Sequence, residues 1–244
     1  TPRAAEFALR RQAADSRLKV VMAFRSLAAV ALLTLLSSCG DGVTPRDALN
    51  RVAGKPVLTI QLDGDDPSAS YGLLQRSGEP LRFSVGQGRY GIACAGSRFE
   101  EGVTPLGRFR VNAILSDDRF EMDPELVESS GKSEDELRST LFRNMNSIDF
   151  KGDGETGEYG NGYISLEPVP PSDQPFEFNS YDGTFRWYSF AIHGSNDQNR
   201  IGQAVTGGCI NAGRFTMDVL VERLKLGDQV EIASNTPCLS ASDP

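Results

Sequence analysis

The chain has 244 residues, a formal net charge of -8 at pH 7 and 39% hydrophobic residues. This length is enough for one sizeable core of ~200 residues plus a tail, so one main domain is expected. The acidic balance argues against a nucleic-acid partner, because phosphate binding requires clustered Lys and Arg and the sequence contains no such stripe.

The N-terminal region has the pattern of an export signal. Residues 1–21 precede Met22 and are interpreted as a non-native upstream extension. Residues 22–39 carry an early Arg25, an apolar run too short to span a membrane, and small residues before Cys39. The ending Leu36-Ser-Ser-Cys39 resembles the lipobox of bacterial lipoproteins, which implies lipidation of Cys39; an ordinary signal peptide with a chance cysteine is the alternative. Residues 40–55 are expected to be a linker to a domain at 56–235, followed by a tail at 236–244.

The first half of the domain is predicted to be β-rich. Mixed apolar and polar runs indicate strands over residues 56–64, 81–86, 89–97 and 108–115. Glycines between the second and third of these favour a hairpin. The third places Tyr90, Ile92 and Cys94 on one face, so Cys94 is expected to be buried. In the fourth, Val111 and Ala113 are expected on the same, core-facing side.

Residues 116–180 change in character and are predicted to be an insertion, either a lid or a flank. Ser133 lies three residues before Glu136, a capping-box pattern that predicts a helix to about Met145. The many turn residues that follow leave room for short strands at most, around 163–167 and 176–178. The acidic residues of this region are also consistent with a merely solvated face.

The last third is predicted to contain a buried strand, a helix and a closing strand. Residues 184–194 form an apolar run with Ala191 and His193 on one face. Met217, Leu220 and Leu224 recur at helical spacing, and a final strand follows Gly227-Asp228. The residues therefore predict a mainly β domain with two helices.

Three cysteines follow Cys39, namely Cys94, Cys209 and Cys238. An exported protein permits disulfides, so these three allow one bridge and one free thiol. Cys94 with Cys238 is the preferred pair because it leaves Cys209 free, although the sequence alone does not establish that the two side chains meet.

His193 is the sole histidine of the chain and lies sixteen positions before Cys209. A nearby imidazole can take the proton of a thiol and later deliver it to a leaving group. Gly207 and Gly208 would allow a sharp turn and leave N–H groups for a developing oxyanion. A structural histidine, an ordinary tight turn, or a disulfide at Cys209 are the competing interpretations.

The stretch from Ile192 to Asn211, IHGSNDQNRIGQAVTGGCIN, resembles the active-site signature of the L,D-transpeptidase catalytic domain (YkuD-like). The matching positions are His193-Gly194, Ile201-Gly202, Thr206, Gly208, Cys209, Ile210 and Asn211. Upstream, the Thr104-Pro105-x-Gly107 segment and its flanking strands also resemble the family. The resemblance implies a sandwich- or barrel-like mainly β fold with one or two flanking helices. It departs from the family at Gly207, where a His is common.

Carried over position by position, the resemblance implies that Cys209 is the nucleophile and His193 its base. The Gly194 carbonyl or the Ser195 hydroxyl would orient the imidazole. Residues expected around the oxyanion and the substrate are Thr206, Gly207, Gly208 and Asn211. Trp187 and Tyr188 could line a substrate groove, although a core position is the stronger expectation.

The implied activity is a cysteine acyl transfer on peptidoglycan stem tetrapeptides, which releases D-Ala and forms 3-3 cross-links or attaches another amine acceptor. A lipid-anchored location in the bacterial periplasm or cell envelope is expected, with no metal or other cofactor. Two alternatives remain open: an L,D-carboxypeptidase or endopeptidase with the same Cys-His pair, and a non-catalytic cell-wall-binding lipoprotein.

Overall fold

The computed structural model describes residues 55–76, 78–95, 101–169, 178–181, 184–187 and 190–239. The predicted signal segment, Cys39 and the linker lie outside these residues. Within the described ranges, no helix is long and apolar enough to cross a membrane. The elements are β1 (Leu58–Leu62), η1 (Pro67–Ala69), β2 (Tyr71–Leu74), β3 (Leu81–Gly88), β4 (Gly91–Ala93), β5 (Val103–Pro105), β6 (Gly107–Leu115), β7 (Phe120–Met122), α3 (Pro124–Ser130), α4 (Glu134–Asn146), β8 (Tyr163–Pro168), β9 (Phe178–Tyr181), β10 (Thr184–Trp187), β11 (Phe190–His193), η2 (Gln198–Arg200), β12 (Ala204–Thr206), β13 (Ile210–Ala212), α5 (Arg214–Arg223) and β14 (Gln229–Ser234).

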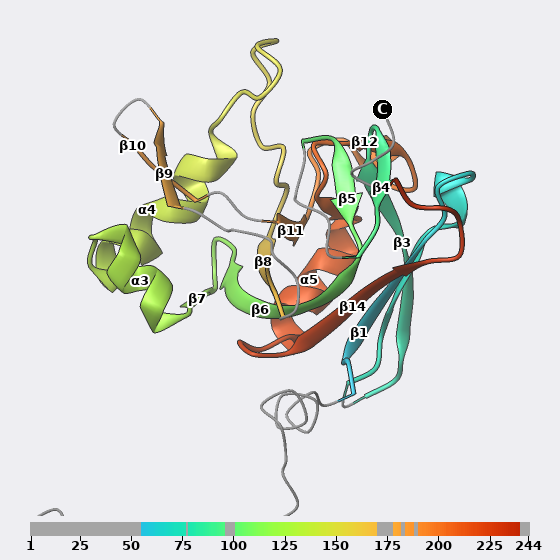
Figure 1. Ribbon diagram of the computed structural model, residues 1–244. Helices are drawn as coiled ribbons and strands as arrows, with labels where there is room; N and C mark the ends of the chain where they lie inside the picture. Colours follow the sequence, from blue (N-terminus) through green and yellow to red (C-terminus); the bar gives the residue numbers. More distant parts are fainter. Residues whose placement is uncertain are drawn as a thin grey trace, which may run out of the picture. The chain divides into compact units, whose positions relative to one another are not determined.

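Eight strands close into a barrel-like sheet (Figure 1), which confirms the predicted mainly β fold. Their order is β3-β13-β11-β8-β6-β14-β1-β2, and β2 pairs with β3 to complete the circle. β12 adds to β3 in parallel, and β7 extends β6. Closure satisfies the hydrogen-bonding edges that an open sheet would expose.

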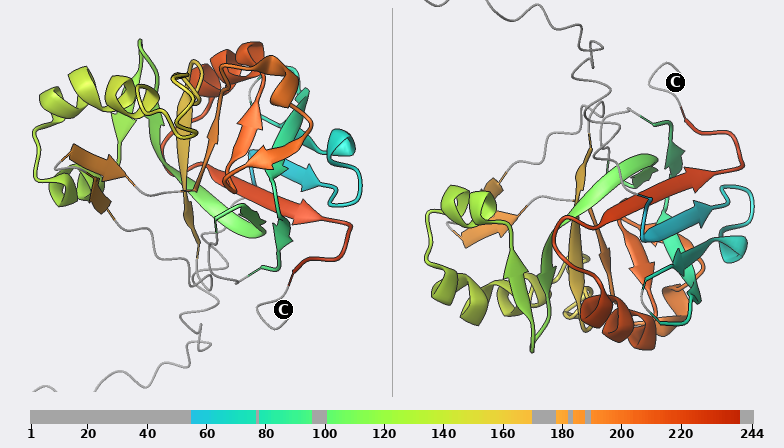
Figure 2. Two further views of the ribbon diagram at one scale, coloured as in Figure 1. Left: turned by 90° about the horizontal axis from the view of Figure 1, so that it is seen from above. Right: turned by 90° about the horizontal axis from the view of Figure 1, so that it is seen from below.

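The main core fills the interior of this sheet. It is built from alternating residues of all eight strands, such as Ile60, Phe109 and Phe190, each fully buried. The predicted C-terminal helix is present as α5, which contributes Met217 and Leu220 to the same cluster. Figure 2 shows α5 on a different side of the sheet from α3 and α4.

A β-bulge in β6 corrects one prediction. The pairing of β6 with β8 shifts between Val111 and Ala113, so one extra residue enters β6 at that point. As a result Val111 and Ile114 face the main core, whereas Ala113 belongs to a second cluster. The expectation that Val111 and Ala113 share one face is therefore wrong.

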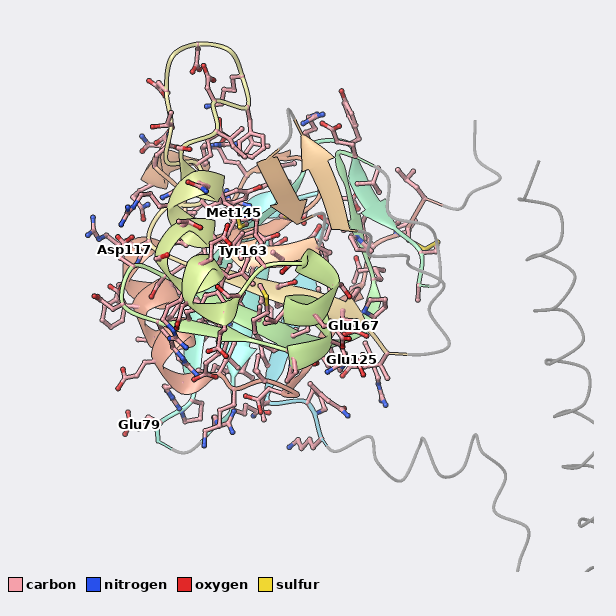
Figure 3. The ribbon with its side chains drawn as sticks, turned by 90° about the vertical axis from the view of Figure 1, so that its left-hand side faces the viewer. Glu79, Asp117, Glu125, Met145, Tyr163 and Glu167 are labelled. Carbon is pink, nitrogen blue, oxygen red and sulfur yellow. A yellow bond between two sulfur atoms is a disulfide. The ribbon has the colours of Figure 1, made fainter. Side chains whose placement is uncertain are left out.

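The second cluster lies between the sheet and α4. The helix predicted from the capping-box pattern is confirmed as α4, and its N-cap is Ser133, whose side chain accepts a hydrogen bond from the Glu136 amide at 3.2 Å. α4 buries Leu141 and Met145 against Tyr163 of β8. Figure 3 labels Met145, a residue of α4, close to Tyr163, which belongs to the same cluster.

Three further expectations about the strands are wrong. β3 and β4 do not form a hairpin, because both edges of β3 are occupied by β2 on one side and by β13 and β12 on the other. β4 instead pairs in parallel with β5. Ile92 is buried as expected, but Tyr90 is 64% exposed. The single strand predicted over 184–194 is divided into β10, which pairs with β9, and β11, which joins the barrel.

Cys94 and Cys238 form a disulfide, as preferred from the sequence, and Cys209 is free. The bridge attaches the C-terminal segment to β4. Leu239 strengthens this attachment, because its amide donates to the Ile92 carbonyl (2.8 Å) and its carbonyl accepts from the Cys94 amide (3.1 Å). Cys94 is half-buried rather than buried as expected.

Candidate active site

Two adjacent parallel strands place His193 and Cys209 on one face of the sheet. β11 pairs with β13 so that His193 lies opposite Asn211, two residues after Cys209. Cys209 directly precedes β13 and packs against both the main core and the cluster beneath α4 that contains Ala191. If the spacing of β13 is continued to Cys209, its Cα atom is expected about 8 Å from that of His193.

The turn before Cys209 is held by hydrogen bonds of the Thr206 hydroxyl. Gly208 is buried and has φ +117°, a backbone conformation that favours glycine. Thr206 Oγ1 accepts from the Gly208 amide at 3.1 Å and donates to the Cys209 carbonyl at 2.6 Å. The Gly208 amide is therefore already occupied, which removes it from the expected set of free oxyanion donors.

The Cys209 amide is a more suitable donor. No hydrogen-bond partner of the Gly207 or Cys209 amide is found among the described residues. The Cys209 amide belongs to the same residue as the sulfur, so it lies beside any carbonyl that the sulfur attacks. Gly207 is exposed, and its carbonyl accepts from the Gly102 amide at 2.8 Å.

The imidazole of His193 is oriented by a backbone carbonyl. Its Nδ1 lies 2.7 Å from the Gly194 oxygen. A carbonyl can only accept, so Nδ1 carries the proton and Nε2 of the neutral ring is left with its lone pair. The Ser195 hydroxyl instead donates to the Asp197 carbonyl at 2.8 Å and accepts from the Asp197 amide at 3.1 Å. Of the two orienting groups predicted, the geometry thus favours Gly194.

Two tyrosines from the region predicted as an insertion enclose the imidazole. Tyr163 is paired with His193 across β8 and β11, and the two rings are stacked with centroids 6.3 Å apart. Tyr159 meets the imidazole edge-on at 5.0 Å. Gly160 permits this approach, since a Cβ there would lie 2.4 Å from the Ser195 amide nitrogen. These aromatic walls restrict the ring to one orientation.

Burial keeps both reactive groups neutral. Desolvation lowers the pKa of His193 to about 4, against the opposing effect of its hydrogen bond to Gly194. Desolvation raises the pKa of the Cys209 thiol to about 11, and a hydrogen bond from the Ala191 backbone offsets part of this rise. At neutral pH these shifts leave Cys209 as a thiol and His193 as a neutral imidazole.

A group of charges beside the imidazole modulates the same equilibrium. Glu158 forms ion pairs with Arg200 (3.5 Å) and Lys151 (3.1 Å). Arg200 lowers the pKa of His193 and Glu158 raises it, so the two effects oppose each other. Sequence reasoning missed Lys151, Glu158 and both tyrosines, because nothing in the local pattern links residues 150–163 to His193. It also did not single out Arg200, although this residue lies within the 192–211 signature stretch.

The remaining predicted residues are distributed as follows. Thr206 and Asn211 are buried, and the Asn211 Oδ1 atom has no hydrogen-bond partner among the described residues. Tyr188 and the side chain of Trp187 lie outside the described residues, so the predicted groove lining stays a prediction. Within the part of the chain that the structure describes, no group of three metal-ligating side chains is found.

One protein family and several solved structures are similar to this chain. A family model described as the L,D-transpeptidase catalytic domain matches residues 66–232. A search of curated proteins finds no match. Similar solved structures include an L,D-transpeptidase from Mycobacterium smegmatis (14% identity, TM-score 0.35, 73% of this chain and 59% of that one). A second is L,D-transpeptidase 3 from Mycobacterium tuberculosis with a faropenem-derived adduct (13% identity, TM-score 0.38, 73% of this chain and 60% of that one). A third is an L,D-transpeptidase from Xylanimonas cellulosilytica (14% identity, TM-score 0.33, 78% of this chain and 70% of that one).

The chain spans 59% of the first of these relatives, so the match concerns part of that protein. The family model covers more than half of the present chain, including β11, the turn at Cys209 and β13. This chain belongs to the L,D-transpeptidase catalytic-domain family.

Proposed function

We propose that the protein is a cysteine acyl-transferase that acts on the stem tetrapeptides of peptidoglycan. The observation that carries the proposal is the pairing of β11 with β13, which sets the free Cys209 diagonally opposite an imidazole whose Nδ1 is held by a carbonyl. Family membership supports the same class of reaction.

The first half-reaction forms an acyl-enzyme. The Cys209 sulfur attacks the carbonyl that precedes the terminal D-Ala, while Nε2 of His193 takes the thiol proton. The carbonyl oxygen becomes an oxyanion beside the Cys209 amide. The C–N bond to D-Ala then breaks, the imidazolium returns the proton to the departing amine, and a thioester remains on Cys209.

The second half-reaction transfers the acyl group to an amine. The nitrogen of the acceptor amine attacks the thioester carbonyl and gives a proton to His193. The C–S bond breaks as the new amide forms. The sulfur regains the proton from His193. A water molecule in place of the amine would give a hydrolase, so the fate of the thioester distinguishes the two activities.

The test is incubation of the full chain with purified disaccharide-tetrapeptide muropeptides, followed by mass spectrometry. Dimers and free D-Ala support the transferase, whereas tripeptides and free D-Ala alone would replace it with a hydrolase. Cys209→Ala is expected to abolish every product. If the wild-type chain gives no product from these muropeptides, the proposal is overturned in favour of a non-catalytic cell-wall binder.

We also propose that this activity is anchored in the cell envelope through a lipid on Cys39, which supports access to peptidoglycan. Expression in a bacterium with a radiolabelled fatty acid is expected to label the wild-type chain and not Cys39→Ala. Equal labelling of the wild type and of Cys39→Ala would refute lipidation at Cys39.

A further inference from the structure

The Thr104-Pro105-x-Gly107 segment has no role in the proposed chemistry, yet Thr104 contacts the nucleophile turn directly. Thr104 lies on β5 and is fully buried. Its Oγ1 accepts from the Gly88 amide at 2.7 Å and donates to the Gly208 carbonyl at 2.9 Å. The Thr104 hydroxyl thus donates its single hydrogen bond to Gly208, the residue that precedes Cys209.

The hydrogen bond to the Gly208 carbonyl also determines where the Cys209 amide points. The Gly208 C=O and the Cys209 N–H belong to one planar trans peptide group, in which the two bonds point in opposite directions. Since Thr104 holds the oxygen on the side of β5, the Cys209 N–H is directed away from β5. The same N–H has no hydrogen-bond partner among the residues described.

The preceding peptide group is held from the same side. The Gly102 amide, next to β5 in the sequence, donates to the Gly207 carbonyl at 2.8 Å, and the Arg89 amide donates to the Thr206 carbonyl at 3.0 Å. Three successive carbonyls of the turn are therefore bound by β5 and the end of β3. Gly208, with φ +117°, is the residue at which the backbone would otherwise turn most easily.

We propose that Thr104 is a positioning residue for acyl transfer, which fixes the Gly208–Cys209 peptide so that the Cys209 amide meets the developing oxyanion. The inference rests on the proposed use of Cys209 as a nucleophile. Loss of the Thr104 hydroxyl frees this peptide to rotate, and the oxyanion then loses a preorganised donor. Removal of one such donor typically costs 10²–10³-fold in rate, so misorientation of it is expected to cost about 10- to 100-fold.

The test compares two reactions of Cys209 that differ in their need for an oxyanion donor. Acylation by p-nitrophenyl acetate passes through a tetrahedral oxyanion, whereas alkylation by iodoacetamide displaces iodide and forms none. Thr104→Val keeps the shape of the side chain and removes the hydroxyl; Thr104→Ser restores it. Thr236→Val is the matched control, since Oγ1 of Thr236 also accepts a hydrogen bond from a backbone amide, that of Gly64, at 2.9 Å.

Thr104→Val is expected to slow acylation about 10- to 100-fold while alkylation stays within about threefold of wild type. Thr104→Ser is expected to recover most of the acylation rate, and Thr236→Val to leave both rates unchanged. Equal acylation by wild type and Thr104→Val, or an equal loss of both reactions, would overturn the inference. A wild-type chain that is inert toward muropeptides yet shows this pattern would refute the proposed substrate alone.

Discussion

Lowering the pH from 6.5 toward 4 is expected to destabilise the fold through protonation of His193 in the unfolded chain. In the unfolded chain its imidazole takes up a proton near pH 6.5, whereas in the folded chain burial lowers its pKa to about 4. Between these values the unfolded state binds one proton more than the folded state. Stability is therefore complete above pH 6.5 and falls as the pH decreases toward 4.

The size of the effect follows from the two pKa values. Each tenfold change in proton affinity corresponds to about 1.4 kcal/mol, so the difference between 6.5 and about 4 amounts to about 3 kcal/mol of unfolding free energy. This is a large part of the 5–15 kcal/mol that typically stabilises a domain. The same pKa keeps the imidazole available as a base down to about pH 5.

Two measurements check this reasoning. Because the chain contains one histidine, isotope labelling of histidine gives a single imidazole signal, whose NMR titration reports the pKa directly. Urea unfolding of the wild type and of His193→Gln, at pH 7 and pH 4.5, gives the loss of stability and the part that depends on the ring. A titration at pH 6.5 or above, or an equal loss in both proteins, would refute the assignment.

Three further variants test the site and the disulfide. Gly207→His is expected to change the unfolding free energy by less than about 1 kcal/mol, because the nearest side-chain atom to a new Cβ is Glu101 Cγ at 3.9 Å; a larger loss in urea titrations would contradict the open space. The pair Cys94→Ser and Cys238→Ser is expected to lower stability by about 2–5 kcal/mol, and an unchanged urea midpoint would argue against a stabilising bridge. Gly160→Ala is expected to cost about 2 kcal/mol or more, since its methyl would meet a backbone nitrogen at 2.4 Å and its φ is +61°; a melting temperature equal to wild type would refute this clash.

Local patterns in the sequence predicted the elements whose causes are local. The Ser133 cap and α4, the α5 helix and the strands at 58–62 and 107–115 follow from capping chemistry and from apolar periodicity. The disulfide followed from the requirement that one cysteine remain free. Cys209 and His193 stood out because the chain has a single imidazole.

The features that depend on register between distant strands could not be read in this way. Closure of the barrel requires β2 to pair with β3, and the parallel pairing of β4 with β5 replaces the expected hairpin. The bulge in β6 reverses the faces of the residues that follow it. The aromatic walls of the site depend on Tyr163 being opposite His193, a pairing that alternation within each strand leaves open.

Cys209, the proposed nucleophile, lies between the two cysteines of the native disulfide in the sequence. The native bridge is therefore favoured only if folding precedes oxidation. Cys209 lies only 29 residues from Cys238, whereas the native partner Cys94 is 144 residues away. In a disordered chain the shorter loop closes more easily by about 1.4 kcal/mol, or about tenfold. A chain oxidised before it folds would thus preferentially trap its own reactive sulfur in the wrong bridge. We therefore expect early oxidation to block the proposed nucleophile, and a catalyst of disulfide exchange to restore it.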